Sequence, residues 1–98
     1  MHARVVTFQV QPGKREEAVR LFKEEVVPAA HRQKGFKGGL VLTDPNTGKG
    51  MTIGLWEAEA DMKATEASGF YQGWTAKFAN LFAAPPVREH YEVSIKDI

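Results

Sequence analysis

Proton transfer near neutral pH is the first chemistry that this sequence offers, and it rests on three histidines. His31 stands near the end of a predicted helix, and an unperturbed imidazole pKa of about 6.5 would let it act as a general base at a pocket mouth. The alternative is a cation that complements the negative end of the helix dipole. His2 lies near a terminus and His90 on a predicted strand, and the three show no metal-ligand spacing. We therefore expect His31 to be the proton acceptor, and we expect no metal site.

Aromatic side chains form a second group with a possible function, because they can stack on a flat ligand. Phe70, Trp74 and Phe78 recur at helical spacing, with Tyr71 beside them. Such a stripe usually packs into the core, but it can also line an apolar cavity. Trp56, at the end of a predicted strand, is a candidate core aromatic that anchors the next helix. A ligand site should leave a cavity of about 300 Å³ or more with convergent polar groups, whereas a filled core should leave almost none.

Composition excludes several other classes of chemistry. The sequence has no cysteine, which excludes disulfides, thiolate catalysis and cysteine-bound zinc or iron–sulfur sites. The formal net charge is +1 and no basic run occurs, so neither nucleic acid nor an anionic membrane surface is an expected partner. No apolar run approaches the roughly 20 residues that span a bilayer, and no signal-peptide stretch is visible. We therefore expect a soluble, cytoplasmic protein.

The elements that must position these side chains follow one another without a linker. Residues 3–10 predict a strand with apolar side chains on both faces, and residues 14–33 predict a helix. Pro28 should kink this helix or end its regular part early. Residues 36–43 and 50–56 predict a hairpin, because turn formers fill the segment between them. On the second of these strands, side chains alternate between two faces, with Thr52, Gly54 and Trp56 on one and Met51, Ile53 and Leu55 on the other.

The second half of the chain repeats this pattern. Residues 57–82 predict a helix that is broken at Ser68-Gly69, and residues 87–95 predict the last strand. The order β-α-β-β-α-β predicts one α+β domain over residues 1–98, ferredoxin-like, with an antiparallel four-stranded sheet and both helices on one face. The other face also carries apolar residues, and a chain this short has no third layer to cover it. We therefore expect a homodimer formed through the open sheet face.

Several local sequences resemble the antibiotic biosynthesis monooxygenase family of dimeric α/β barrels. They are Val26-Val27-Pro28-Ala29, Gly35-Phe36, Leu55-Trp56-Glu57 with the Ala/Glu/Asp-rich helix start after it, and the closing strand after Pro85-Pro86. The resemblance extends over nearly the whole chain. It implies a ligand pocket between the sheet and the helices of each protomer and a dimer packed sheet on sheet. Family members include cofactor-independent oxygenases of phenols and quinols, haem-degrading proteins and many small proteins of no known activity.

The resemblance assigns roles to particular side chains. It implies that Trp56 forms a pocket wall stacked on a planar aromatic substrate. The oxygenases of this type carry an Asn four residues before this Trp and a Tyr shortly after it, and the corresponding residues here are Thr52 and Met62. Thr52 can donate one hydrogen bond, whereas Met62 cannot exchange a proton. Tyr71 and Tyr91 are the candidates to take the place of that tyrosine.

The resemblance implies an activity without metal, flavin or other cofactor. Haem-degrading members use an axial His on the second helix, and residues 57–82 contain none, so haem is not expected. The expected activity is a monooxygenase whose planar phenol, quinol or quinone substrate loses a proton and reacts directly with dioxygen. His31 and Trp56 would be its catalytic residues, and its substrate-binding residues would be Thr52, Phe70, Tyr71, Trp74 and Tyr91. Two alternatives remain: a non-enzymatic dimeric module for a small apolar ligand or a stress response, and a structural protein whose own side chains fill the cavity.

Overall fold

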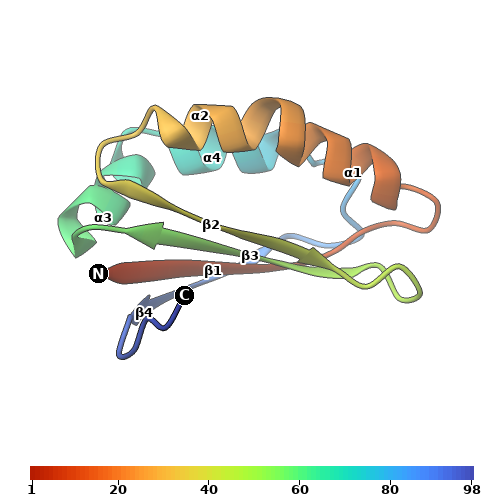
Figure 1. Ribbon diagram of the computed structural model, residues 1–98. Helices are drawn as coiled ribbons and strands as arrows, with labels where there is room; N and C mark the ends of the chain where they lie inside the picture. Colours follow the sequence, from red (N-terminus) through yellow and green to blue (C-terminus); the bar gives the residue numbers. More distant parts are fainter.

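The computed structural model describes residues 1–98 as two layers, a four-stranded antiparallel sheet with every helix on one of its faces (Figure 1). The strands are β1 (His2–Gln9), β2 (Phe36–Thr43), β3 (Lys49–Trp56) and β4 (Val87–Glu92), in the sheet order β2-β3-β1-β4. The helices are α1 (Arg15–Leu21), η1 (Phe22–Val26), α2 (Val27–His31), α3 (Glu59–Ala67) and α4 (Phe70–Ala76). The predicted ferredoxin-like order is confirmed.

The helical layer consists of two pieces with different positions over the sheet. In Figure 1, α1, η1 and α2 run as one rod over the sheet, and α4 lies beside that rod. The short helix α3 closes the end of the sheet nearest the N-terminus, where it packs against β1 and β3. No helix is both long and apolar enough to cross a bilayer.

The first helix passes through Pro28 by changing its hydrogen bonding one turn earlier. Regular α geometry ends at Leu21, and Phe22–Val26 forms a π turn in which the Val27 N–H donates to the carbonyl of Phe22, five residues back. Proline has no N–H, and its ring crowds the carbonyl four residues before it, so a wider turn accommodates it. The predicted early end of regular helix is therefore found as a π turn, and the helix ends at His31 instead of residue 33.

The second helix breaks where the sequence predicts but is shorter than expected. Gly69 has a φ of 89°, the left-handed region that favours glycine, and it separates α3 from α4. After Ala76 most of the backbone hydrogen bonds span three residues instead of four, so turns replace the helix predicted to residue 82. The last strand ends at Glu92 instead of residue 95, because Glu92 pairs with His2, where its neighbour β1 begins.

Register decides which face each strand residue covers. Arg4, Val6 and Phe8 alternate along the helix side of β1, and β3 places Thr52 opposite Val6. The main hydrophobic core lies on this side, where β1, the η1 turn and α4 meet.

The opposite face of the sheet has no cover within the chain. Its apolar side chains come from all four strands, and the most exposed include Leu40, Leu42, Val87 and Tyr91, which are between 46% and 58% exposed. Met51, Ile53 and Leu55 share this face, as the alternation of β3 predicts.

Candidate functional site

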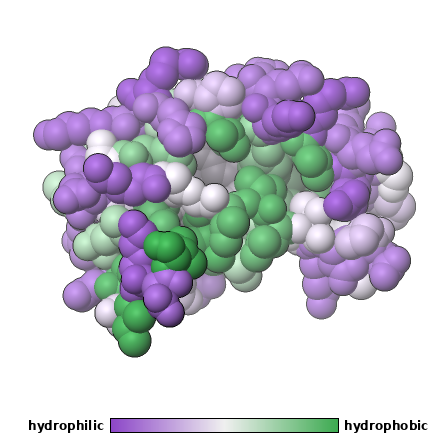
Figure 2. Space-filling view, viewed as in Figure 1, coloured by the Kyte–Doolittle hydropathy of each residue, from purple (hydrophilic) through white to green (hydrophobic).

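An apolar cavity of about 170 Å³ lies between the first helix and the β2–β3 half of the sheet. In Figure 2 it corresponds to the hollow between the upper helical layer and the green, hydrophobic side chains of the sheet. Its volume is below the roughly 300 Å³ expected for drug-sized ligands, yet it is far from a filled core. Cavities of about 150 Å³ hold one benzene-sized ring. The space therefore fits a single ring.

Glycines on adjacent strands keep this cavity open. Gly39 and Gly54 pair across β2 and β3 on the helix side, so neither strand sends a side chain into the space between them. The pairing follows a bulge in β2 at Gly38, whose φ of 97° suits glycine. A Cβ at Gly39 would overlap the Ile53 carbonyl oxygen, so this close approach requires glycine.

The π turn supplies the opposite wall. Phe22 and Val26, the first and last residues of η1, both line the cavity, as do Val27 and Ala30 in the following α turn. A π turn widens the helix and changes which side chains face the sheet. Pro28 therefore determines the shape of this wall although it does not line the cavity itself.

The indole nitrogen of Trp56 is buried without a hydrogen-bond partner. Its side chain is 1% exposed, and its Nε1–H is the one buried side-chain donor without a hydrogen-bond partner. Phe36 packs edge-on against its ring at 5.1 Å, and Nε1 lies toward Gly54, where a Cβ would be 3.4 Å away. An unpaired buried donor costs about 1–3 kcal/mol. An acceptor bound in the cavity would recover that cost.

His31 and Thr52 are the other polar side chains of the cavity besides Arg4. His31 is solvent-exposed at the end of α2, and its ring meets Phe36 edge-on at 5.0 Å. Phe36 thus connects His31 to Trp56, since it contacts both rings. Neither the imidazole of His31 nor the hydroxyl of Thr52 makes a hydrogen bond within the chain. Both remain available to a ligand.

The structure brings together five of the seven side chains that the sequence nominates and leaves two outside. His31, Thr52, Trp56, Phe70 and Trp74 line the cavity. Tyr71 lies outside it, with the guanidinium carbons of Arg4 and Arg88 each 4.9 Å from its ring centre. Burial raises the pKa of Tyr71, against the opposing effect of the two arginines.

Tyr91 lies on the other side of the sheet. It is half-exposed on the open face, and its hydroxyl donates to Glu89 at 2.8 Å. This hydrogen bond to a carboxylate raises the pKa of Tyr91. Met62, which stands where the resemblance implies a tyrosine, is a fully buried core side chain. No tyrosine hydroxyl therefore lines the cavity.

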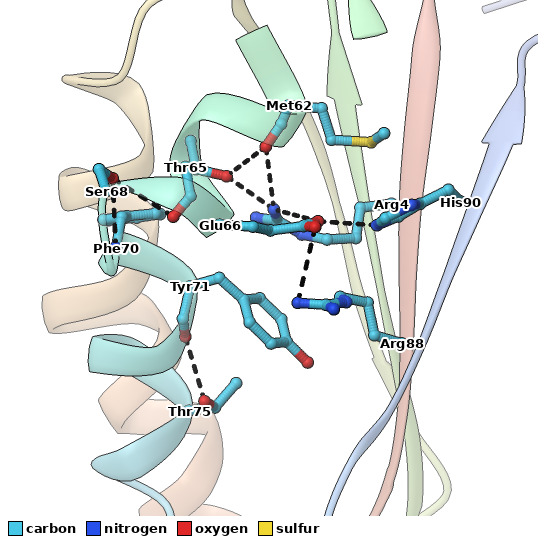
Figure 3. A network of polar contacts seen from close by, with 10 residues as sticks. All are labelled: Arg4, Met62, Thr65, Glu66, Ser68, Phe70, Tyr71, Thr75, Arg88 and His90. Carbon is cyan, nitrogen blue, oxygen red and sulfur yellow. Dashed lines mark hydrogen bonds and ion pairs between the residues drawn. The ribbon is translucent and has the colours of Figure 1, made fainter. Parts of the chain in front are cut away.

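Sequence reasoning missed a charged cluster next to the cavity (Figure 3). Arg4 is 5% exposed and donates from Nη1 to Thr65 at 2.7 Å and to Glu66 at 3.3 Å. Arg88 and His90 pair with the same Glu66 carboxylate, at 3.6 and 2.7 Å. Burial lowers the pKa of Arg4, and Glu66 opposes that effect. The signal in the sequence was an arginine that alternates with Val6 and Phe8 on a face that otherwise predicts core, but its partners lie far away along the chain.

No group of three or more His, Asp or Glu side chains is arranged to hold a metal ion. The polar groups of the cavity instead suit an organic ligand. Trp56 and Arg4 can only donate hydrogen bonds, whereas Thr52 and His31 can donate or accept. The site can therefore hold a flat apolar ring, bind oxygen atoms on it and accept a proton at its mouth.

Known structures share this architecture. A monooxygenase from Streptomyces coelicolor, solved in complex with nanaomycin D, aligns with a TM-score of 0.81 at 18% identity over 99% of this chain and 90% of its own. SnoaB, a cofactor-independent oxygenase from Streptomyces nogalater, aligns with a TM-score of 0.80 at 16% identity, over 97% and 94% of the two chains. Rv0793 from Mycobacterium tuberculosis aligns with a TM-score of 0.75 at 13% identity, over 97% and 96%. No curated protein sequence matches this chain.

Fold and cavity together define a small α+β protein that encloses an apolar space between one sheet and its helices. The family model described as "Antibiotic biosynthesis monooxygenase" matches residues 1–83. The chain belongs to this family, which confirms the predicted resemblance.

Proposed function

We propose that this protein is a cofactor-independent monooxygenase whose substrate is a planar phenol or quinol. The observation that carries the proposal is the Nε1–H of Trp56, buried and unpaired in the wall of an apolar cavity. A substrate oxygen is the acceptor that this donor lacks. The likeness in fold to a cofactor-independent oxygenase and to a monooxygenase with a bound organic ligand supports oxygen chemistry in such a cavity.

Cavity size narrows the substrate class. A space of about 170 Å³ accommodates one aromatic ring with its substituents. Phe70 and Trp74 from α4 and Phe36 from β2 supply flat surfaces around it. The substrate is therefore a single-ring phenol or quinol, and larger fused-ring compounds would require the walls to move.

Activation begins with loss of the phenolic proton. His31 accepts it as the substrate enters at the cavity mouth, where the imidazole is in contact with solvent and can release the proton again. The negative charge spreads from the oxygen over the ring, and the Trp56 N–H stabilises it by a charge-assisted hydrogen bond. Thr52 can donate a second hydrogen bond from β3. The apolar walls exclude water while the anion is exposed to dioxygen.

The reaction balances without a cofactor. The electron-rich ring carbon of the anion attacks dioxygen, one oxygen atom forms the new carbon–oxygen bond, and the oxygen–oxygen bond breaks. The second oxygen atom leaves as water with two protons. The substrate supplies the electrons, so that a phenol and one dioxygen give a quinone and one water. The protein contributes positioning, proton transfer and exclusion of solvent.

Dioxygen consumption with a panel of single-ring phenols and quinols tests the proposal. We expect Trp56→Phe to lower kcat about tenfold to hundredfold, because a hydrogen bond to a charged group is worth about 1.5–3 kcal/mol. His31→Ala should lower it about a hundredfold or more, with partial recovery at high pH. The matched control is His2→Ala, since His2 pairs with Glu59 outside the cavity. Absence of turnover with every substrate would remove the oxygenase.

A non-enzymatic ligand-binding module is the second candidate, and one observation favours it. The tyrosine implied for the phenol-oxidising members is replaced by Met62, and no other tyrosine lines the cavity. A cavity that binds a ring but cannot complete the proton transfer would bind it without oxidising it. Saturable binding of single-ring phenols without dioxygen uptake would support this candidate over the oxygenase.

The proposed assembly is a homodimer formed through the open face of the sheet. Leu40 and Leu42 on β2 and Val87 on β4 are about half-exposed there, and Met51, Ile53 and Leu55 lie between these two edges. A contiguous apolar face of this kind marks an interaction surface. A second copy packed sheet on sheet would bury it by a self-complementary contact.

Sedimentation velocity tests this assembly. We expect the wild-type chain to sediment as a dimer and Leu42→Lys to sediment as a monomer, because a lysine within an apolar interface leaves an unpaired buried charge. Lys34→Ala is the control, since Lys34 is almost fully exposed and lies outside the sheet. A wild-type chain that stays monomeric at high concentration would contradict the homodimer.

A further inference from the structure

The ionisable side chains that line the cavity are all bases. Two ionisable side chains line it, Arg4 at its inner end beside Trp56 and His31 at its mouth, and no carboxylate lines it. The remaining polar side chains are the Trp56 indole and the Thr52 hydroxyl. An apolar space with a permanent cation and unpaired donors favours a ligand that brings negative charge.

Arg4 retains capacity for a further partner. Only its Nη1 donates hydrogen bonds within the chain, to Thr65, to Glu66 and, weakly at 3.5 Å, to the Met62 carbonyl. Its Nε and Nη2 make none. A guanidinium has five N–H donors, so most of the donors of Arg4 remain unused.

The carboxylate beside Arg4 is shared. Glu66 accepts a hydrogen bond from Arg4 and also pairs with Arg88 and His90, so two permanent cations and one histidine share a single negative charge (Figure 3). Consistent with this, burial lowers the pKa of Arg4 despite the presence of Glu66. The cluster carries an excess of positive charge before any ligand arrives.

Arg4 also lies close to Trp56, whose Nε1–H has no hydrogen-bond partner. Its guanidinium carbon is 5.4 Å from the centre of the Trp56 ring that forms the cavity wall. An oxygen that accepts from Trp56 Nε1 at the usual distance of about 2.9 Å would sit in the same positive region.

We infer that this cavity recognises its ligand as an anion, an aromatic carboxylate or an ionised phenol, and that Arg4 determines this specificity. The inference rests on the proposed function in using the same cavity as the ligand site. It adds a charge requirement that neither the fold nor the family model supplies. The acidic group faces the inner end of the cavity beside Arg4 and Trp56, and the ring extends toward Phe36 and the mouth.

Benzoate and benzamide form a matched pair of probes, because they have nearly the same shape and differ in charge. Both contain one ring and suit the cavity volume. Titration calorimetry gives each dissociation constant, and the fluorescence of Trp56 and Trp74, both in the wall, reports occupancy of this cavity. We expect the wild-type chain to bind benzoate at least about tenfold more tightly than benzamide, since hydrogen bonds to charged groups are among the stronger ones.

Three variants separate the role of Arg4 from that of the charged cluster as a whole. Arg4→Met should reduce the benzoate preference to about one while leaving benzamide binding nearly unchanged. Arg4→Lys should keep part of the preference, because it restores a cation. Arg88→Met is the matched control: Arg88 also pairs with Glu66 and packs on Tyr71, but it does not line the cavity, so the preference should persist.

The outcomes distinguish this inference from the oxygenase proposal. Equal binding of the two probes by the wild-type chain, or binding of neither, would overturn the anion specificity even if quinols consumed dioxygen. Preference for benzoate without dioxygen uptake would support the anion site and remove the oxygenase. If Arg4→Met does not fold, the wild-type ratio and the Arg4→Lys ratio decide the question, and a wild-type ratio of about one would argue against a charge-based role.

Discussion

Two glycines on the same face of β3 have opposite surroundings. Gly50 pairs with Phe8 of β1, and a Cβ at Gly50 would overlap the Phe8 ring, which already fills the space above it. Gly54 lies four residues further along and pairs with another glycine, Gly39. A Cβ there would lie 3.4 Å from Trp56 Nε1, at ordinary contact distance. One glycine makes room for a core ring, and the other helps leave a cavity.

The two ends of the helix–sheet interface differ in the same way. At the filled end, Phe8, Phe22, Phe78 and Phe82 pack with ring centres 4.4–5.6 Å apart. At the hollow end, Trp56 keeps a buried donor unpaired. A chain of 98 residues has little stability to spare, so the aromatic cluster at one end must compensate for the cavity at the other.

The largest effect should follow from removing an aromatic ring at the filled end. Phe78 is fully buried and contacts Phe22 and Phe82 with ring centres at 4.4 and 4.9 Å. We expect Phe78→Ala to lower the free energy of unfolding by about 3–5 kcal/mol, because it removes buried apolar surface and leaves a second cavity. Urea unfolding followed by circular dichroism measures this change. A loss below about 1 kcal/mol would mean that the Phe cluster does not stabilise the fold as described.

The sequence predicts this fold well because its signals are local. Alternation places Thr52, Gly54 and Trp56 on one face of β3, and Ser68-Gly69 and Pro85-Pro86 interrupt the second helix and precede the last strand. The predicted ends of the helices and strands were less accurate than their order. β4 ends at Glu92 because its partner strand β1 begins at His2. The local sequence around Glu92 cannot predict this end, since it depends on a strand ninety residues away.

The site is predicted only in part, because its contents depend on contacts between distant segments. His31 was nominated from its type and position and Trp56 from the family resemblance, and both line the cavity. The partners of Arg4 lie about 60 residues later, at Thr65 and Glu66, and no local pattern links them. Tyr91 was nominated for its hydroxyl, but strand register places it on the open face.

An intermediate loss of stability should follow from adding one methyl group at Gly50, where the Phe8 ring fills the space. In Gly50→Ala the new methyl would displace the Phe8 ring, which is stacked on Phe82 at 4.8 Å and cannot move freely. We expect a loss of about 1–3 kcal/mol in the free energy of unfolding, as in other overpacked cores. Thermal unfolding compared with the wild-type chain measures it. The double variant Gly50→Ala with Phe8→Leu should recover part of the loss, and a failure to recover would place the strain elsewhere.

The smallest change in stability, but a clear change in binding, should follow from the same substitution at the hollow end. In Gly54→Ala the methyl group enters the cavity at contact distance from Trp56 and Phe36, without strain in the backbone. Replacing a strand glycine by alanine restricts the unfolded chain, so stability should stay equal or rise by up to about 1 kcal/mol. Benzoate affinity should fall about tenfold or more, because a misplaced methyl in an apolar pocket costs about 1–3 kcal/mol.

Gly73→Ala in α4 is the matched control for this last prediction. A Cβ at Gly73 meets nothing within 4 Å, and the residue does not line the cavity, so the substitution should stabilise the helix by about 1 kcal/mol without changing benzoate affinity. If Gly54→Ala bound benzoate more weakly and Gly73→Ala bound it as the wild-type chain does, at similar stability, the ligand would lie at the hollow end. If Gly54→Ala bound benzoate as tightly as Gly73→Ala, the space beside Gly54 would not be where the ligand lies, and the difference between the two glycines of β3 would concern packing alone.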